Sequence, residues 1–206
     1  MPPLTWESTD YQMGVDRGAF YGEAIPGVAW NGLVSVEEAP VVNEVKSLYL
    51  DGVNFLNVLT GRYFAASVSA FSAPKAFLEA AGTKPVVPGI KLTQQPKNRF
   101  NFSYRVGKKF GYDLHLVYNC VATMSSKEHQ TISENAEPNT LTWEFNATPV
   151  HVAGVFKPTA HFIVDSERTD LDALNDLENM LYGTPSTAPV FPTISELLAF
   201  FGDFGG

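Results

Sequence analysis

The sequence predicts a mainly β protein of the α+β class, in which strands are followed by helices near the carboxyl end. Two observations carry this prediction. Between residues 28 and 165, short runs of alternating apolar and polar residues recur between Gly, Pro, Asn and Asp residues, as is typical of half-buried strands. From Thr169 onward, the leucines recur at helical spacing instead. Strands followed by helices favour an α+β arrangement over a parallel α/β sheet.

The clearest strand signal surrounds Asp51-Gly52, which separates the apolar runs Val45–Leu50 and Val53–Leu59. Asp-Gly favours a type I′ hairpin turn, because both central residues of that turn need a positive φ. Residues 64–71 follow as a third strand, so the three runs together predict a β-meander. The third strand carries no ionisable side chain, which predicts a neutral surface.

The other β elements and loops follow from local patterns. The first 26 residues have weak periodicity and predict an arm or a peripheral loop with short strands. Residues 14–18 are framed by glycines, which indicates a turn. Further strands are predicted at Leu33–Glu38, 99–106, 112–122, 140–150 and 158–165, and loops at 83–98 and 124–139, the second with a short strand at 130–133.

A short helix is predicted after Pro74, because the missing N–H of proline costs nothing in the first turn. Gly82 is expected to end this helix. The last helix should begin at Thr193, which forms a capping box with Glu196.

A longer helix is predicted between these two, with Thr169 as its N-cap and Asp172 as the capping partner. Gly183 is expected to end it. One apolar face is formed by Leu171, Leu174, Leu177 and Leu181.

The length of 206 residues suits one domain with a buried core. We expect a β domain at residues 1–165, including an N-terminal arm, and a helical appendage at 166–206 that packs on the same domain. Charged residues make up only 17% of the chain, below the usual quarter or so. This favours permanent contacts with other subunits, although Ser, Thr and Asn can solvate a neutral surface equally well.

Charge and hydropathy exclude several classes of protein. A net charge of −8 disfavours tight nucleic-acid binding, which needs Lys and Arg at the phosphates. Charged residues arrive early at the N-terminus, before any apolar run, so we expect no secretory signal and synthesis in the cytosol. No apolar run has the length of a membrane span.

The motifs of common enzymes are missing from the sequence. It contains no Gly-x-Ser-x-Gly, Walker A or dinucleotide-binding motif, so we expect no catalytic activity and no cofactor. Its histidines lie at positions 115, 129, 151 and 161 without metal-ligand spacing, and Cys120 is the only cysteine. We therefore expect no metal site and no intramolecular disulfide, with His115 and His161 as packed or surface strand residues. The paired carboxylates at Glu37-Glu38 and along 165–178 are expected to be solvated.

Several stretches, taken in order, resemble the major tail (tail tube) proteins of long-tailed, non-contractile bacteriophages. The matching stretches are 14–18 with Tyr21, 29–34, Asp51-Gly52 with 55–58, 64–71 leading to Pro74 and Phe77, 102–105, 114–119, Trp143 with Thr148-Pro149, 157–161 and 181–183.

The resemblance implies a β-sandwich or half-barrel with a short flanking helix and C-terminal helices. It implies a virion protein of the tail, made in the host cytoplasm, whose subunits form hexameric rings that stack into a tube. Its partners would be further copies of itself, the tape measure protein, and the tail terminator and distal tail proteins. DNA would pass through the lumen without specific binding, and an acidic lumen would repel its phosphates.

Strands that pair between subunits should lack edge-blocking lysines. We therefore expect the meander to supply the self-assembly contacts, which would be Leu48, Leu50, Asp51, Gly52, Phe55, Phe64, Val68 and Phe71.

Two other functions stay open. The chain could be a different tail part, such as the distal tail protein or the tail terminator ring, and copy number per virion would distinguish these. It could also be a carbohydrate-binding β-sandwich with an exposed tryptophan platform. Trp30 and Trp143 would form that platform, although the alternation places Trp143 in the core. A hydrolase is the weakest alternative.

Overall fold

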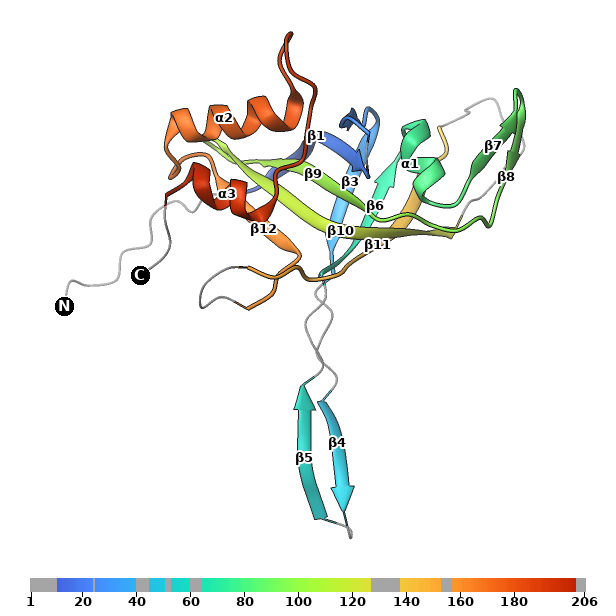
Figure 1. Ribbon diagram of the computed structural model, residues 1–206, viewed down its shortest axis with the longest axis vertical. Coiled ribbons are helices and arrows are strands. Elements are labelled where there is room, and N and C mark those ends of the chain that lie inside the picture. Colours follow the sequence, from blue (N-terminus) through green and yellow to red (C-terminus); the bar gives the residue numbers. More distant parts are fainter. Residues whose placement is uncertain are drawn as a thin grey trace, which may run out of the picture.

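Strands dominate the computed structural model, which describes residues 11–23, 25–39, 45–50, 53–59, 64–126, 138–152 and 157–202 (Figure 1). Strand residues far outnumber helix residues among these, so the prediction of a mainly β, α+β fold is confirmed. None of the helices in this described part is long and apolar enough to cross a membrane.

One antiparallel sheet of eight strands organises the chain. The strands are β1 (Met13–Gly22), β2 (Val28–Ala29), β3 (Leu33–Glu38), β6 (Phe64–Ala70), β9 (Phe100–Gly107), β10 (Tyr112–Ser126), β11 (Leu141–Ala147) and β12 (His161–Asp165). Their order is β2-β1-β9-β10-β11-β6-β3, and β12 pairs with β10. The predicted strands at 99–106, 112–122, 140–150 and 158–165 therefore exist with shifted ends, and the strand at 33–38 has the predicted bounds.

Strand β10 belongs to both halves of this sheet. Its first part pairs with β12 and β9, and its second part, from Cys120, pairs with β11. The change occurs at an irregularity between Val117 and Cys120, where Asn119 has a φ of 51°. The sheet folds over here, so that Glu38 at the end of β3 reaches Tyr104 on β9.

An aromatic core fills the space inside the folded sheet. Helix α1 (Lys75–Ala80) packs Phe77 against both Trp30 and Trp143, with ring centroids 4.3 and 5.3 Å away. Phe20, Phe100, Phe102, Phe145 and Cys120 are buried in the same core. Because Trp30 is only 3% exposed and Trp143 is fully buried, the tryptophan platform for sugars is not accessible.

The outer face of the same strands carries a second core under two helices. Helix α2 (Leu171–Tyr182) and helix α3 (Ile194–Phe200) cover this face (Figure 1). The buried residues here are Ala19, Tyr21, Leu114, Leu116, Tyr118, Val164, Leu174, Leu177, Leu181 and Leu197. Alternate residues of a strand point to opposite faces, so β1 and β10 are buried on both sides.

The N-terminal prediction was wrong, because residues 13–22 form the long strand β1. Its pairing with β9 is interrupted twice, between Met13 and Val15 and between Asp16 and Ala19. Arg17 has a φ of 46° at the second interruption. These irregularities break the alternation that a sequence pattern detects, and they explain why 14–18 looked like a turn.

The meander was only partly predicted. Strands β4 (Val45–Leu50) and β5 (Val53–Leu59) pair with each other as expected, while their turn at Asp51-Gly52 lies outside the described residues. Strand β6, however, pairs with β3 and β11 rather than with β5. Its neutral sequence has a simple cause: both of its edges are occupied within the chain, and Ala66, Val68 and Ala70 face the core.

Smaller corrections concern loops and caps. Residues 83–98 contain a two-stranded sheet, β7 (Lys84–Val87) and β8 (Ile90–Leu92), where a loop was expected. Asp170, not Thr169, caps α2, and Leu171 is 69% exposed rather than part of the apolar face. The capping box of Thr193 and Glu196 is present as predicted. The strand expected at 130–133 lies outside the described residues.

Candidate functional site

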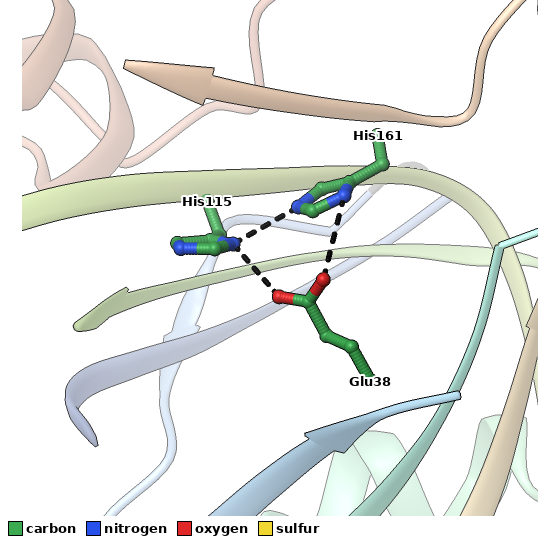
Figure 2. A group of neighbouring side chains, drawn as sticks. All are labelled: Glu38, His115 and His161. Carbon is green, nitrogen blue, oxygen red and sulfur yellow. Dashed lines mark hydrogen bonds and ion pairs between the residues drawn. The ribbon is translucent and has the colours of Figure 1, made fainter. Parts of the chain in front are cut away.

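Three strands bring Glu38, His115 and His161 together at the open end of the inner face (Figure 2). His161 is opposite Val117 in the β10–β12 pairing, and His115 is opposite Ile163. The two histidines are thus diagonal neighbours on one face of the sheet. Glu38 is the last residue of β3 and reaches them from the opposite side of the fold.

The polar atoms of this cluster converge on His115 Nδ1. This nitrogen lies 3.0 Å from His161 Nε2 and 3.1 Å from Glu38 Oε1. His161 Nδ1 lies 4.0 Å from the other carboxylate oxygen of Glu38. The Tyr104 hydroxyl donates to Glu38 Oε1 over 2.7 Å. A neutral imidazole nitrogen carries at most one proton, so His115 Nδ1 cannot donate fully to both of its neighbours.

Ring stacking holds the imidazoles in place. The His115 ring stacks on Tyr104 at 4.5 Å and on His161 at 5.1 Å between centroids. Phe64 packs against the far side of His161 at 4.5 Å. His115 is only 4% exposed, and within the described structure its Nε2 atom is buried without a hydrogen-bond partner.

The electrostatics of the cluster favour a charged Glu38 carboxylate beside an uncharged His161 ring. The hydrogen bond from His115, together with that from Tyr104, lowers the pKa of Glu38 to about 2 against the opposing effect of burial. Burial lowers the pKa of His161 to about 4, although the Glu38 charge opposes this. Burial and the neighbouring Glu38 raise the pKa of the Tyr104 phenol. At neutral pH the cluster therefore offers an ionised carboxylate, a neutral His161 imidazole and a protonated phenol.

A pocket of about 550 Å³ adjoins the cluster. Glu38, Tyr104 and His115 form part of its wall, and Val34, Val36 and Ile163 supply much of its apolar lining. The ligand atoms of Glu38, His115 and His161 lie within 4.8 Å of one another. Two imidazoles and a carboxylate are a donor set that suits Zn²⁺ and similar ions, and the pocket borders two of these donors, Glu38 and His115.

Sequence reasoning missed this cluster. It treated His115 and His161 as isolated strand residues and Glu38 as a solvated carboxylate. The one available signal was local: His115 alternates with Leu114 and Leu116, which places a histidine on the inner face of a strand that is apolar on both sides. The fold-over that brings Glu38 to this face has no signature in the local pattern.

The predicted self-assembly residues are distributed over different environments. Leu48, Leu50 and Phe55 lie in β4 and β5, whereas Asp51 and Gly52 lie outside the described residues. Phe64 is half-buried against His161, and Phe71 is 51% exposed. Val68 is fully buried in the core, so it offers no surface to another subunit.

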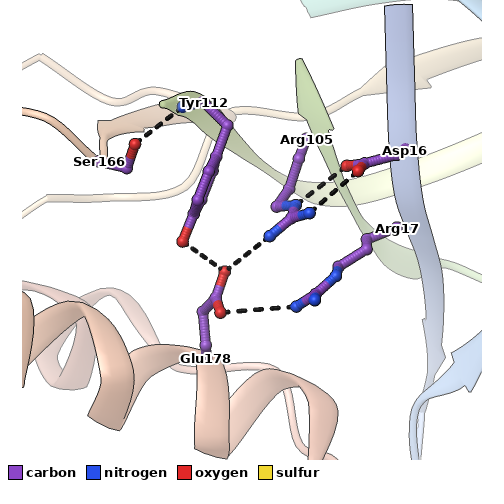
Figure 3. A network of polar contacts seen from close by, with 6 residues as sticks. All are labelled: Asp16, Arg17, Arg105, Tyr112, Ser166 and Glu178. Carbon is purple, nitrogen blue, oxygen red and sulfur yellow. Dashed lines mark hydrogen bonds and ion pairs between the residues drawn. The ribbon is translucent and has the colours of Figure 1, made fainter. Parts of the chain in front are cut away.

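A second polar network on the outer face fixes α2 to the sheet (Figure 3). Arg105 on β9 forms two hydrogen bonds to Asp16 at 3.0 and 2.9 Å and an ion pair with Glu178 of α2 at 3.5 Å. The Tyr112 hydroxyl donates to Glu178 over 2.8 Å, and Arg17 lies 3.7 Å from the same carboxylate. Each charge in this network has an opposite partner, as expected for a structural contact.

Comparison of the chain with models of known protein families and with curated proteins found no match.

Proposed function

We propose that the chain is a structural virion protein, a self-assembling subunit of the tail tube of a long-tailed, non-contractile bacteriophage. The subunits would form hexameric rings that stack into the conduit for DNA ejection, and the role requires no catalysis. The observation that carries this proposal is the β4–β5 hairpin, because in the described part of the chain it pairs with no other strand.

An isolated two-stranded hairpin is marginally stable in water. The outer edges of β4 and β5 also present backbone N–H and C=O groups that no described strand satisfies. A neighbouring subunit would complete this sheet by strand addition. The sequence of the hairpin suits such pairing, since Lys46 is its only basic residue and lysine is the residue that most often blocks a sheet edge.

Charge supports the same role. The net charge of −8 suits a conduit through which DNA slides, because acidic walls repel phosphates. It disfavours proteins that grip nucleic acid tightly. The low charged fraction of 17% agrees with a subunit that keeps permanent neighbours.

Electron microscopy of the purified protein tests this proposal. We expect rings or tubes from the wild type, and their loss in a double variant, Leu50→Lys with Phe55→Lys, which adds charge to the hairpin. The thermal unfolding temperature of the double variant should stay close to that of the wild type, because β4 and β5 pair with no strand of the large sheet.

A double variant, Val86→Lys with Val190→Lys, is the matched control, because it adds the same two charges at apolar residues that are already 58% and 50% exposed and lie outside the hairpin. It should assemble like the wild type. A wild-type protein that stays monomeric at high concentration would contradict the proposal, as would a hairpin double variant that still forms tubes.

A further inference from the structure

We propose that Glu38, His115 and His161 bind one divalent transition-metal ion of the Zn²⁺ class, which ties the end of β3 to the β10–β12 pair. This inference concerns a different part of the molecule from the hairpin and does not depend on the tail tube proposal.

The spacing of the donor atoms fits a tetrahedral ion. Zn²⁺ binds imidazole nitrogen and carboxylate oxygen at about 2.0 to 2.1 Å, which places two ligands of one ion roughly 3.3 Å apart. His115 Nδ1 lies 3.0 Å from His161 Nε2 and 3.1 Å from Glu38 Oε1. One ligand atom of each residue lies within 4.8 Å of the ligand atoms of the other two, so His161 and Glu38 would move toward each other when an ion binds between them.

Proton counting favours a cation at this point. Around His115 Nδ1 stand a carboxylate oxygen and a second imidazole nitrogen, and all three atoms carry lone pairs when deprotonated. A single proton on His115 Nδ1 can form a good hydrogen bond to His161 or to Glu38, but not to both. A cation at the centre would accept a lone pair from each of the three groups and remove this conflict.

The surroundings supply the rest of a coordination sphere. The Tyr104 hydroxyl donates to Glu38 Oε1 over 2.7 Å, which is how an outer partner orients a ligating carboxylate. Stacking on Tyr104 holds the His115 ring, and a tilted contact with Phe64 holds the His161 ring. The pocket of about 550 Å³ beside Glu38 and His115 provides room for a water molecule as the fourth ligand.

The donor set narrows the choice of ion. Two nitrogens and one carboxylate suit Zn²⁺, Cu²⁺, Ni²⁺ or Co²⁺, whereas Mg²⁺ and Ca²⁺ prefer all-oxygen sites. A bound ion would cross-link β3, which ends the sheet order, to β10 and β12. We therefore expect the metal to stabilise the fold.

Titration calorimetry tests the site directly. The tag-free protein is treated with EDTA, dialysed, and titrated with ZnCl₂. We expect one equivalent to bind with a dissociation constant in the micromolar range or below, and the unfolding temperature to rise by several degrees in excess Zn²⁺. MgCl₂ should produce neither effect. Substituted Co²⁺ should give the visible absorption bands of a tetrahedral site.

The variants are His161→Gln and Glu38→Gln, which keep the size and polarity of the side chains. Each should weaken Zn²⁺ binding at least tenfold and remove most of the Co²⁺ absorption. His151→Gln is the matched control, because His151 is exposed and outside the cluster. His115 is left unchanged because its burial makes folding sensitive to substitution. Circular dichroism confirms that each variant is folded.

The proposal is overturned if the wild type binds no stoichiometric Zn²⁺. It is equally overturned if both glutamine variants bind Zn²⁺ as the wild type does, or if His151→Gln removes the binding. Since the hairpin is not involved, the outcome is independent of whether the protein forms tubes.

Discussion

The two polar clusters occupy opposite faces of the same β9–β10 pair, and they are built on different principles. Tyr104 and Arg105 are adjacent in β9, yet Tyr104 points to the inner cluster of Glu38 and His115, while Arg105 points to the outer network of Asp16 and Glu178. In the outer network each charge meets an opposite charge. In the inner cluster the acceptor atoms outnumber the protons between them. Balanced charges indicate a structural clasp, whereas an excess of converging acceptors indicates a place for a cation.

The largest expected effect comes from breaking the outer network with Arg105→Ala. The Arg105 side chain is 13% exposed and Glu178 is 18% exposed, so the substitution removes one of two cations from a largely buried carboxylate. It also removes the two hydrogen bonds that Arg105 donates to Asp16. We expect the free energy of unfolding to fall by about 3 kcal/mol, measured by urea denaturation.

Arg168→Ala is the control for that substitution, because Arg168 is 87% exposed and lies 3.8 Å from Asp165. Its loss should change stability by less than about 0.5 kcal/mol. If both variants had the same stability as the wild type, the outer network would not be the clasp that holds α2.

The second-largest effect should be a loss of stability in acid, which we expect from the inner cluster and not from the outer network. In metal-free protein the pKa of His161 is about 4 against an ordinary value of 6.5, because burial opposes its protonation. The unfolded state then binds more protons than the folded state between these two values, so stability falls as the pH drops from about 6.5 to 4. The loss should approach about 2 to 3 kcal/mol in the presence of a chelator.

His161→Gln should flatten this pH dependence, which chemical denaturation at pH 7 and pH 4.5 would measure. The groups that face His161 are Glu38, His115 and Phe64. The pKa of Glu38 is about 2, below its ordinary value of 4.5. Protonation of Glu38 therefore reduces the stability further only when the pH falls below about 4.5. The outer clasp should persist at pH 4.5, because Arg105 holds the pKa of Asp16 below its ordinary value. An unchanged pH profile in His161→Gln would refute this account.

The smallest effects should come from a matched pair of tyrosines. Tyr104 donates to Glu38 over 2.7 Å, and Tyr112 donates to Glu178 over 2.8 Å. Tyr104→Phe should cost about 1 to 2 kcal/mol and Tyr112→Phe about 0.5 to 1 kcal/mol, because Tyr104 is buried and Tyr112 only partly so. Thermal unfolding of both variants provides the comparison, and equal or reversed losses would show that burial does not set their relative cost.

Features that depend on neighbouring residues were predictable. The strand bounds of β4 and β5 and the alternation of Leu141, Trp143 and Phe145 follow from local patterns. So does the capping box of α3, because a cap is complete within one turn. Strand β1 was missed for the converse reason: two interruptions in its pairing hide the alternation of its side chains.

Pairing and site geometry were not predictable in this way. Nothing in residues 53–70 distinguishes a strand that pairs with its neighbour in sequence from one that pairs with β11. The predicted pairing of β4 with β5 was therefore confirmed, whereas the predicted place of β6 beside β5 was wrong. The inner cluster likewise requires β10 to change partners near Asn119 and the sheet to fold over.

The sequence by itself determined the strands with regular alternation and the three helices, because alternation, spacing and caps act over a few residues. It did not determine the interrupted strand β1 or the β7–β8 pair. Its acidic composition, with few charged residues, can also be read directly from the sequence. Only the tertiary structure decided that Glu38, His115 and His161 meet. Their meeting depends on strand order and on which face each strand buries, and these are settled by packing across the whole core.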